Sequence, residues 1–260
     1  MAEPSPRELL ETHDLLPADP LAVVLVGSHA RGWAHTGSDI DIMAVVEQPV
    51  TDPRAVPLEV SVRPDRIQAV IVHAGGPRLE IKYWLADQID QVLDRVSWEA
   101  FEHRDTIEDG LDVQSRIMLE RLMNGRPLHG DSWANSLSER IRSSAFRAFQ
   151  VNSALAECDG RAESALGMLA SGDADSAVLT AREAFGCAID ALLMAHGELN
   201  ANRKWRARRF RELEPGSMSY AEYWDWETMR GLDPDAPGEW VRDVVRLCKN
   251  MWLDIDLQGV

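Results

Sequence analysis

The chain has 260 residues, enough for one large domain or two modest ones, and 45% hydrophobic residues give it the composition of a globular protein. Its net charge of -16 argues against a general nucleic-acid binder, because an acidic protein repels a polyanion. No run approaches the roughly 18 consecutive apolar residues that a membrane span needs, and the acidic start does not resemble a signal peptide. The three cysteines show neither metal-ligand nor disulfide spacing, so we expect a cytoplasmic protein.

Strand-like patterns dominate the first part of the chain. A short helix is expected over residues 6–16, which have a proline near their start. Apolar runs or alternation of apolar and polar residues predict strands at 21–26, 39–46, 58–62 and 78–84. Residues 65–72 fit either a helix or a strand. From Leu85 the apolar residues take helical spacing, which predicts a helix.

Helical patterns replace the strands beyond about residue 110, where we expect no further strand. Helices are expected at 111–123, 136–170, 175–196 and 238–253. The third has Asp173 or Asp175 to cap its start and Gly197 to end it.

Gly125, Pro127 and Gly130 cluster where the pattern changes, so the expected domains are residues 1–124 and 125–260. The expected fold class is α+β: a small mixed β-sheet domain with flanking helices, followed by an α-helical bundle.

The residues with the clearest chemistry follow the first strand. Gly27-Ser28 stands at the end of that strand, and Asp39 and Asp41 follow after ten intervening residues, on one face of the next strand. Glycine lets the backbone approach phosphate oxygens, and Ser28 with nearby N–H groups can bind a polyphosphate, especially if this segment opens a helix. Two carboxylates close together form a hard oxygen site suited to Mg²⁺.

The string GSHARGWAHTGSDIDIMAVV resembles the active-site motif of the DNA polymerase β nucleotidyltransferase superfamily, and within it the minimal and antibiotic-modifying (aminoglycoside or lincosamide) branches. The resemblance covers about the first 85–100 residues. It implies a nucleotide site that includes Gly27, Ser28, Arg31 and Ser38. Arg31 has two open roles, contacting a phosphate or pairing with an aspartate to brace the loop. His29 and His35 lack ligand spacing and are expected to be incidental.

The resemblance also implies a third carboxylate on a later strand. Glu80 lies in the strand pattern RLEIKYW just before a helix, and Glu59 lies in the shorter LEV, so we favour Glu80. Asp39, Asp41 and Glu80 are therefore the expected catalytic and metal-binding residues. Whether Glu80 would be a ligand, a general base or both stays open. So does a structural role, with Glu80 paired to Lys82 or Arg78.

A basic segment stands out in this acidic chain, since six of the nine residues 203–211 are basic. The helix and loop before it resemble the helical region of some small-molecule nucleotidyltransferases, in which a lysine reaches the nucleotide phosphates. This resemblance implies that Lys204 binds nucleotide. The alternative is a solvated helix whose cations pair with surface carboxylates.

The expected function is Mg²⁺-dependent transfer of a nucleotidyl group from ATP or another nucleoside triphosphate to a hydroxyl of a small acceptor, with release of pyrophosphate. An acidic chain with a helical second domain favours a small metabolite or antibiotic as acceptor. Two alternatives stay open, nucleotidylation of a protein as in toxin–antitoxin modules and a catalytically silent nucleotide-binding regulator.

Overall fold

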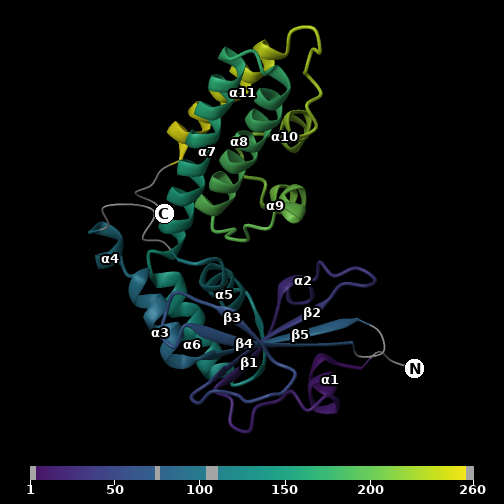
Figure 1. Ribbon diagram of the computed structural model, residues 1–260, viewed down its shortest axis with the longest axis vertical. Coiled ribbons are helices and arrows are strands. Elements are labelled where there is room, and N and C mark those ends of the chain that lie inside the picture. The colour runs from purple at the N-terminus through teal and green to yellow at the C-terminus, as the bar shows by residue number, and fades with distance from the viewer. Residues whose placement is uncertain (1–3, 74–76, 104–110, 256–260) are drawn as a thin grey trace. The chain divides into compact units, whose positions relative to one another are not determined.

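The computed structural model of the protein describes residues 4–73, 77–103 and 111–255. The chain divides into two compact units, Met1–Ala145 and Phe146–Val260. The first is a mixed α/β unit built on one β-sheet, and the second is entirely helical in the part that the structure describes (Figure 1). This arrangement confirms the expected fold class.

The sheet has six strands in the order β3-β4-β5-β2-β1-β6. Their bounds are β1 Ala22–Val26, β2 Ile40–Val46, β3 Val56–Glu59, β4 Arg66–His73, β5 Arg78–Leu85 and β6 Arg126–His129. The β2–β5 pair is parallel and the other pairs are antiparallel. The segment 65–72, ambiguous in sequence, is therefore mostly strand, because both its neighbours pair with it.

Helices cover both faces of this sheet. The helix α1, Pro6–Thr12, packs Leu9 and Leu10 into a core with the side chains of one face. The helices α3, α5 and α6 contact strands of the sheet, and α4 follows α3 (Figure 1). Their bounds are α3 Ala86–Arg95, α4 Trp98–Glu102, α5 Val113–Met123 and α6 Asp131–Ser143.

The expectation of no strand beyond residue 110 is wrong, because β6 pairs with β1. Two glycines permit this pairing. A Cβ on Gly125 would lie 2.3 Å from Val24 Cγ1, and a Cβ on Gly130 would lie 2.0 Å from the carbonyl oxygen of Leu21. The glycines of this segment therefore serve close packing against β1. The expected boundary at 124/125 and the division at 145/146 differ because β6 and α6 join the first unit.

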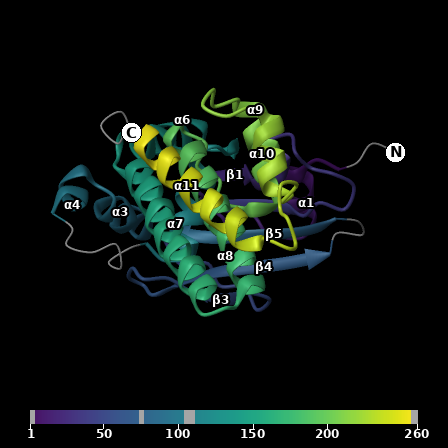
Figure 2. The ribbon, with the colours of Figure 1, turned by 90° about the horizontal axis from the view of Figure 1, so that it is seen from above.

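Three long helices form the second unit and lie alongside one another (Figure 2). They are α7 Phe146–Ala170, α8 Ala174–Ala195 and α11 Pro237–Asp254. Between α8 and α11 the chain forms the 3-10 turn η2 Arg203–Trp205 and the short helices α9 Arg206–Leu213 and α10 Tyr220–Glu227. Asp173 caps α8 by accepting a hydrogen bond from the N–H of Ser176, and Gly197 follows its end with a φ of 87°. Both confirm the predicted limits of this helix.

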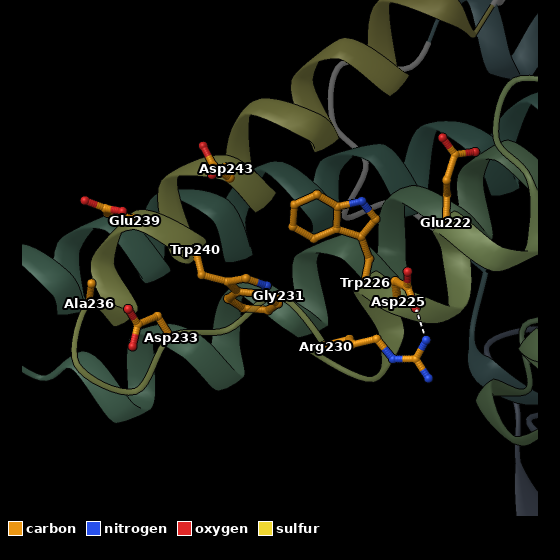
Figure 3. Close-up of a pocket in the computed structure, with 10 residues that line it drawn as sticks. All are labelled: Glu222, Asp225, Trp226, Arg230, Gly231, Asp233, Ala236, Glu239, Trp240 and Asp243. Carbon is orange, nitrogen blue, oxygen red and sulfur yellow. Dashed lines mark ion pairs between the residues drawn. The ribbon is translucent and has the colours of Figure 1, made fainter.

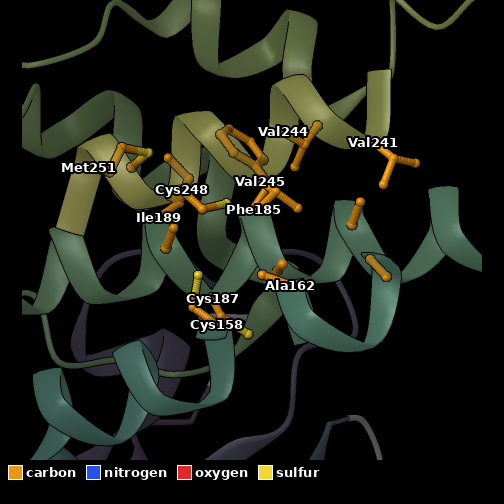
Figure 4. Close-up of a cluster of buried hydrophobic side chains, with 14 of the residues drawn as sticks. Cys158, Ala162, Phe185, Cys187, Ile189, Val241, Val244, Val245, Cys248 and Met251 are labelled. Atoms are coloured by element: carbon orange, nitrogen blue, oxygen red, sulfur yellow. The ribbon is translucent and has the colours of Figure 1, made fainter. Parts of the chain in front are cut away.

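The core of the helical unit contains Cys158, Cys187 and Cys248, all free thiols (Figure 4). They come from α7, α8 and α11, the three long helices. Burial raises the pKa of the Cys187 thiol to about 12. The Cys187 thiol therefore stays protonated at neutral pH, and all three thiols pack within the core.

A buried ionic cluster ties α9 to α8. Asp190 accepts hydrogen bonds from Arg206 Nη2 and Arg209 Nη2, each at 2.6 Å. Burial opposes the charge of Arg206, yet its hydrogen bond to Asp190 and the charges of Asp190 and Glu227 together outweigh burial and raise the pKa of Arg206. Gly186 leaves the space for this guanidinium, since a Cβ there would lie 2.7 Å from Arg206 Nη1. Two cations of the basic segment 203–211 are therefore structural.

We predict that Asp190→Asn strongly destabilises the helical unit, because it leaves two buried guanidinium groups without their carboxylate. The expected cost is about 3–5 kcal/mol, as for other broken buried ion pairs. Asp159→Asn removes the same charge from an exposed position on α7 and should cost less than about 0.5 kcal/mol. Urea unfolding followed by circular dichroism measures both, and equal midpoints would contradict the prediction.

Candidate active site

The site begins where β1 ends. Gly27 has a φ of +69° and opens α2, Gly27–Ala30, a single helical turn. A Cβ at Gly27 would lie 2.6 Å from Asp41 Oδ2. Only glycine satisfies both demands, a left-handed φ and close approach to a carboxylate of the neighbouring strand. The condition that favours phosphate binding, a helical turn that begins at Gly27, is therefore present.

The three predicted carboxylates lie on or directly beside two neighbouring strands. In the parallel pairing of β2 with β5, Asp41 is the direct partner of Glu80, and Asp39 precedes β2 by one residue. The side chains of Asp41 and Glu80 are 19% and 17% exposed, and that of Asp39 is 40% exposed. Glu59 lies on the edge strand β3, which pairs with β4 and not with β2 or β5. The structure therefore brings Glu80, and not Glu59, to the aspartates.

Three cationic side chains contact these carboxylates. Arg78 donates from Nη1 to Asp39 Oδ2 at 2.7 Å and from Nη2 to Glu80 Oε2 at 2.9 Å. Lys82 Nζ lies 3.3 Å from Glu80 Oε1, and Arg121 Nη1 lies 3.5 Å from Asp41 Oδ1.

Sequence reasoning noted Arg78 and Lys82 only as structural partners of Glu80, and it missed Arg121. The first unit therefore places three cations at the carboxylates, besides Arg31 in the loop. The strand alternation of Arg78, Glu80 and Lys82 was a usable signal, whereas Arg121 comes from a distant helix.

The pKa of Asp41 is raised. Burial is the main cause, the charges of Glu80 and Asp39 add to it, and Arg121 and Lys82 oppose it. Because the folded-state pKa exceeds the unfolded one, the ionised carboxylate lowers the free energy of unfolding above that pKa, and the cost disappears at lower pH. The attraction of Arg121 and Lys82 therefore does not fully offset the cost that burial and the neighbouring carboxylates impose on ionised Asp41. Perturbed groups of this kind concentrate at functional sites.

The loop between α2 and β2 is braced from within. Arg31 Nη1 donates to Glu120 Oε1 of α5 at 3.2 Å, and its guanidinium lies 3.9 Å from the centre of the Trp33 ring. The brace that sequence suggested for Arg31 therefore exists, with a glutamate in place of an aspartate. Ser38 Oγ accepts a hydrogen bond from the backbone N–H of His35 at 2.9 Å. His29 Nε2 lies 3.4 Å from the carbonyl oxygen of Ser38, so the His29 ring contacts the backbone of the same loop.

The carboxylates fit a divalent cation by their chemistry. Across the described residues, no three His, Cys, Asp or Glu side chains are grouped to hold a metal ion, and these carboxylates contact Arg78, Lys82 and Arg121 instead. Carboxylate oxygens are nevertheless the ligands that Mg²⁺ prefers. A positive charge near Asp41 would oppose the effect of burial on its pKa and favour its ionised form.

Lys204 lies in the second unit, exposed on η2. Its Nζ is 5.3 Å from the centre of the Trp205 ring, and it makes no ion pair with any residue that the structure describes. The segment 203–211 is not one continuous α-helix, because the 3-10 turn η2 precedes α9. Lys204, Arg208 and Arg211 therefore do not share one continuous helical face. Arg208 pairs with Glu212, as the solvated-helix alternative expects.

The helical unit also contains a pocket of about 460 Å³ at α10, α11 and the segment between them (Figure 3). Trp226 and Trp240 line it, with ring centres 6.3 Å apart. Arg230 pairs with Asp225 at 2.9 Å. The lining carboxylates outnumber this arginine and are those of Glu222, Asp225, Asp233, Glu239 and Asp243. The electrostatic field of this pocket favours a cation.

No helix in the described ranges has the length and apolarity needed to cross a membrane. The first unit combines a mixed sheet, a glycine-serine turn and carboxylates on or beside adjacent strands. Residues 8–118 match the family model of the nucleotidyltransferase domain, a domain of the DNA polymerase β-like superfamily, and this range includes Asp39, Asp41 and Glu80. The first unit therefore contains a nucleotidyltransferase domain.

Among solved structures, the chain is similar to a nucleotidyltransferase-like protein from Exiguobacterium sibiricum 255-15, at 10% sequence identity and a TM-score of 0.47. The alignment covers 97% of this chain and 73% of that one. No curated protein matches the chain.

We predict that Gly27→Ala impairs nucleotidyl transfer at least roughly tenfold, because its methyl group must displace the Asp41 carboxylate. Gly32→Ala is the matched control. Gly32 has nearly the same φ, +68°, but a Cβ there meets nothing within 4 Å. Both variants carry the cost of an alanine in the left-handed region, so the comparison isolates the contact with Asp41. Equal activities in the two variants would show that the contact with Asp41 is unimportant.

Proposed function

We propose that the protein transfers a nucleoside monophosphate, by default AMP, from a nucleoside triphosphate to a hydroxyl of a small-molecule acceptor. The acceptor oxygen forms a bond to the α-phosphorus, the bond from that phosphorus to the β-phosphate oxygen breaks, and pyrophosphate leaves. The hydroxyl proton passes to a carboxylate or to water. The observation that carries this proposal is the pairing of Asp41 with Glu80 beside the Gly27-Ser28 turn.

Each residue of the site has a part in this proposal. Asp39, Asp41 and Glu80 would hold Mg²⁺, which supplies charge neutralisation of the phosphates when bound. Gly27 and Ser28 bring backbone N–H groups and a hydroxyl toward the polyphosphate. Arg31 and Ser38 complete the predicted nucleotide contacts, with the hydrogen bond between Ser38 and His35 fixing the loop that carries them.

Charge supports a small and neutral or cationic acceptor. The net charge of -16 disfavours anionic acceptors by repulsion. The acidic pocket lined by Trp226 and Trp240 offers charge complementary to an amine. These features agree with the antibiotic-modifying branch, whose acceptors include aminoglycosides and lincosamides. The proposal therefore includes a hydroxylated amine as the preferred acceptor class.

A mass-spectrometric screen tests this function. The full-length protein is incubated with Mg²⁺, each of the four common nucleoside triphosphates and pools of hydroxylated amines, neutral sugars and anionic metabolites. A nucleotidyl mass increment on an amine pool supports the proposal, and an increment on a protein supports nucleotidylation of proteins. Nucleotide binding without pyrophosphate release under every condition would contradict transfer and favour a silent regulator.

The carboxylates give the second test. Asp39→Asn, Asp41→Asn and Glu80→Gln should each lower transfer by at least roughly 100-fold, because each removes a charge from one site. Glu59→Gln changes an exposed glutamate on the edge strand and should keep activity within about twofold. Steady-state rates measure the ranking, and a reversed order of Glu80 and Glu59 would contradict it. Asp41→Asn should not lower the melting temperature at neutral pH, since it removes a buried charge.

Lys204 remains a proposed phosphate contact. It is exposed, and its ammonium group pairs with no carboxylate among the described residues, so it is available to a ligand. We predict that Lys204→Ala raises the KM for the nucleoside triphosphate about tenfold. Lys249→Ala, at an exposed position of α11, is the control and should leave KM unchanged. Arg206→Ala is unsuitable as a control, because it would break the buried pair with Asp190.

A further inference from the structure

Arg78 has an unusual position among the cations of the site. It is the first residue of β5, and its guanidinium contacts two of the three carboxylates at once, Asp39 at 2.7 Å and Glu80 at 2.9 Å. The two contacts use different nitrogens, Nη1 and Nη2. A single side chain thus holds two like-charged groups that would otherwise repel each other.

The three cations of the site differ in their freedom to move. Lys82 is 10% exposed and also donates from Nζ to Gln114 Oε1 at 3.1 Å. Arg121 is 24% exposed and lies 3.5 Å from Asp41, a longer contact. Arg78 is 36% exposed, the most of the three, and makes the shortest ion pair. An exposed arginine loses little when it turns into solvent, so Arg78 is the cation that can be displaced.

We propose that Arg78 is a displaceable counter-ion, which holds Asp39 and Glu80 together in the metal-free protein and competes with a divalent cation for their oxygens. This inference rests on the proposed function, since it requires that these carboxylates take up the metal. Arg78 acts here as a positioning residue. It lowers the affinity for the metal, and in return it prevents the carboxylates from separating while the metal is absent.

Competition by Arg78 should lower the affinity of the site for a metal ion. A metal ion that binds Asp39 and Glu80 must break both contacts of Arg78 and must enter beside its positive charge. Removal of the guanidinium abolishes both costs, so affinity for the metal should rise. A purely structural arginine would have the opposite effect, because its loss would disorder the ligands and weaken binding.

Titration of the full-length protein with Mn²⁺ in the absence of nucleotide tests this inference. Isothermal titration calorimetry, checked by the electron paramagnetic resonance of free Mn²⁺, measures affinity without recourse to activity. Arg78→Gln should bind Mn²⁺ more tightly than the wild type, on the order of tenfold. Arg66→Gln removes the same charge from an exposed position at the start of β4 and should match the wild type. Arg78→Lys keeps the positive charge but cannot contact both carboxylates with two nitrogens. Its affinity for Mn²⁺ should lie between those of the wild type and Arg78→Gln.

Thermal melting adds a second readout. Without metal, Arg78→Gln should melt below the wild type, since its carboxylates repel each other, and Mn²⁺ should raise its melting temperature more than that of the wild type. Mn²⁺ affinity in Arg78→Gln that equals or falls below the wild-type value would overturn the inference. If Asp41→Asn also abolishes the binding, the proposed metal site survives that failure. If Asp41→Asn binds Mn²⁺ like the wild type, the metal lies elsewhere and both proposals fail.

Discussion

The parallel register of β2 against β5 is the constraint on which the candidate site depends. It makes Asp41 and Glu80 direct partners on adjacent strands. Because strand side chains alternate, a slip of one residue would turn Glu80 toward the opposite face of the sheet. That opposite face is fixed by apolar packing, since Ile40, Ile42 and Ile81 are buried in the core that contains α1. The hydrophobic core on one side of the sheet therefore holds the carboxylates in place on the other.

Two features of the candidate site lower the stability of the fold. Burial and two neighbouring carboxylates raise the pKa of Asp41, and Gly27 occupies a left-handed conformation directly against it. Neither feature strengthens the fold, because a buried charge costs free energy and a glycine loses more conformational entropy on folding than other residues. These costs are acceptable at a binding site, because a bound ligand can offset them. The helical unit follows the other strategy, in which Asp190 offsets its buried guanidinium groups internally.

The sequence predicted what depends on local patterns and missed what depends on distant contacts. The strands at 21–26, 39–46 and 78–84 were foreseen from apolar runs and alternation, and Asp39 and Asp41 from their spacing after Gly27-Ser28. The strand β6 was missed, because four residues with a proline have no strand pattern and owe their conformation to β1. Arg121 was missed for the same reason, since only the packing of α5 brings it to Asp41.

The three buried thiols of the helical unit have a consequence for how its motions can be observed. Each of α7, α8 and α11 contributes one, and the first unit contains no cysteine. A thiol reagent added to the native protein must wait until these helices separate, so the rate of labelling follows the opening of that unit alone. The protein thus has a natural reporter in one unit and none in the other. Labelling rates with and without nucleotide would reveal whether occupation of the first unit alters the opening of the second.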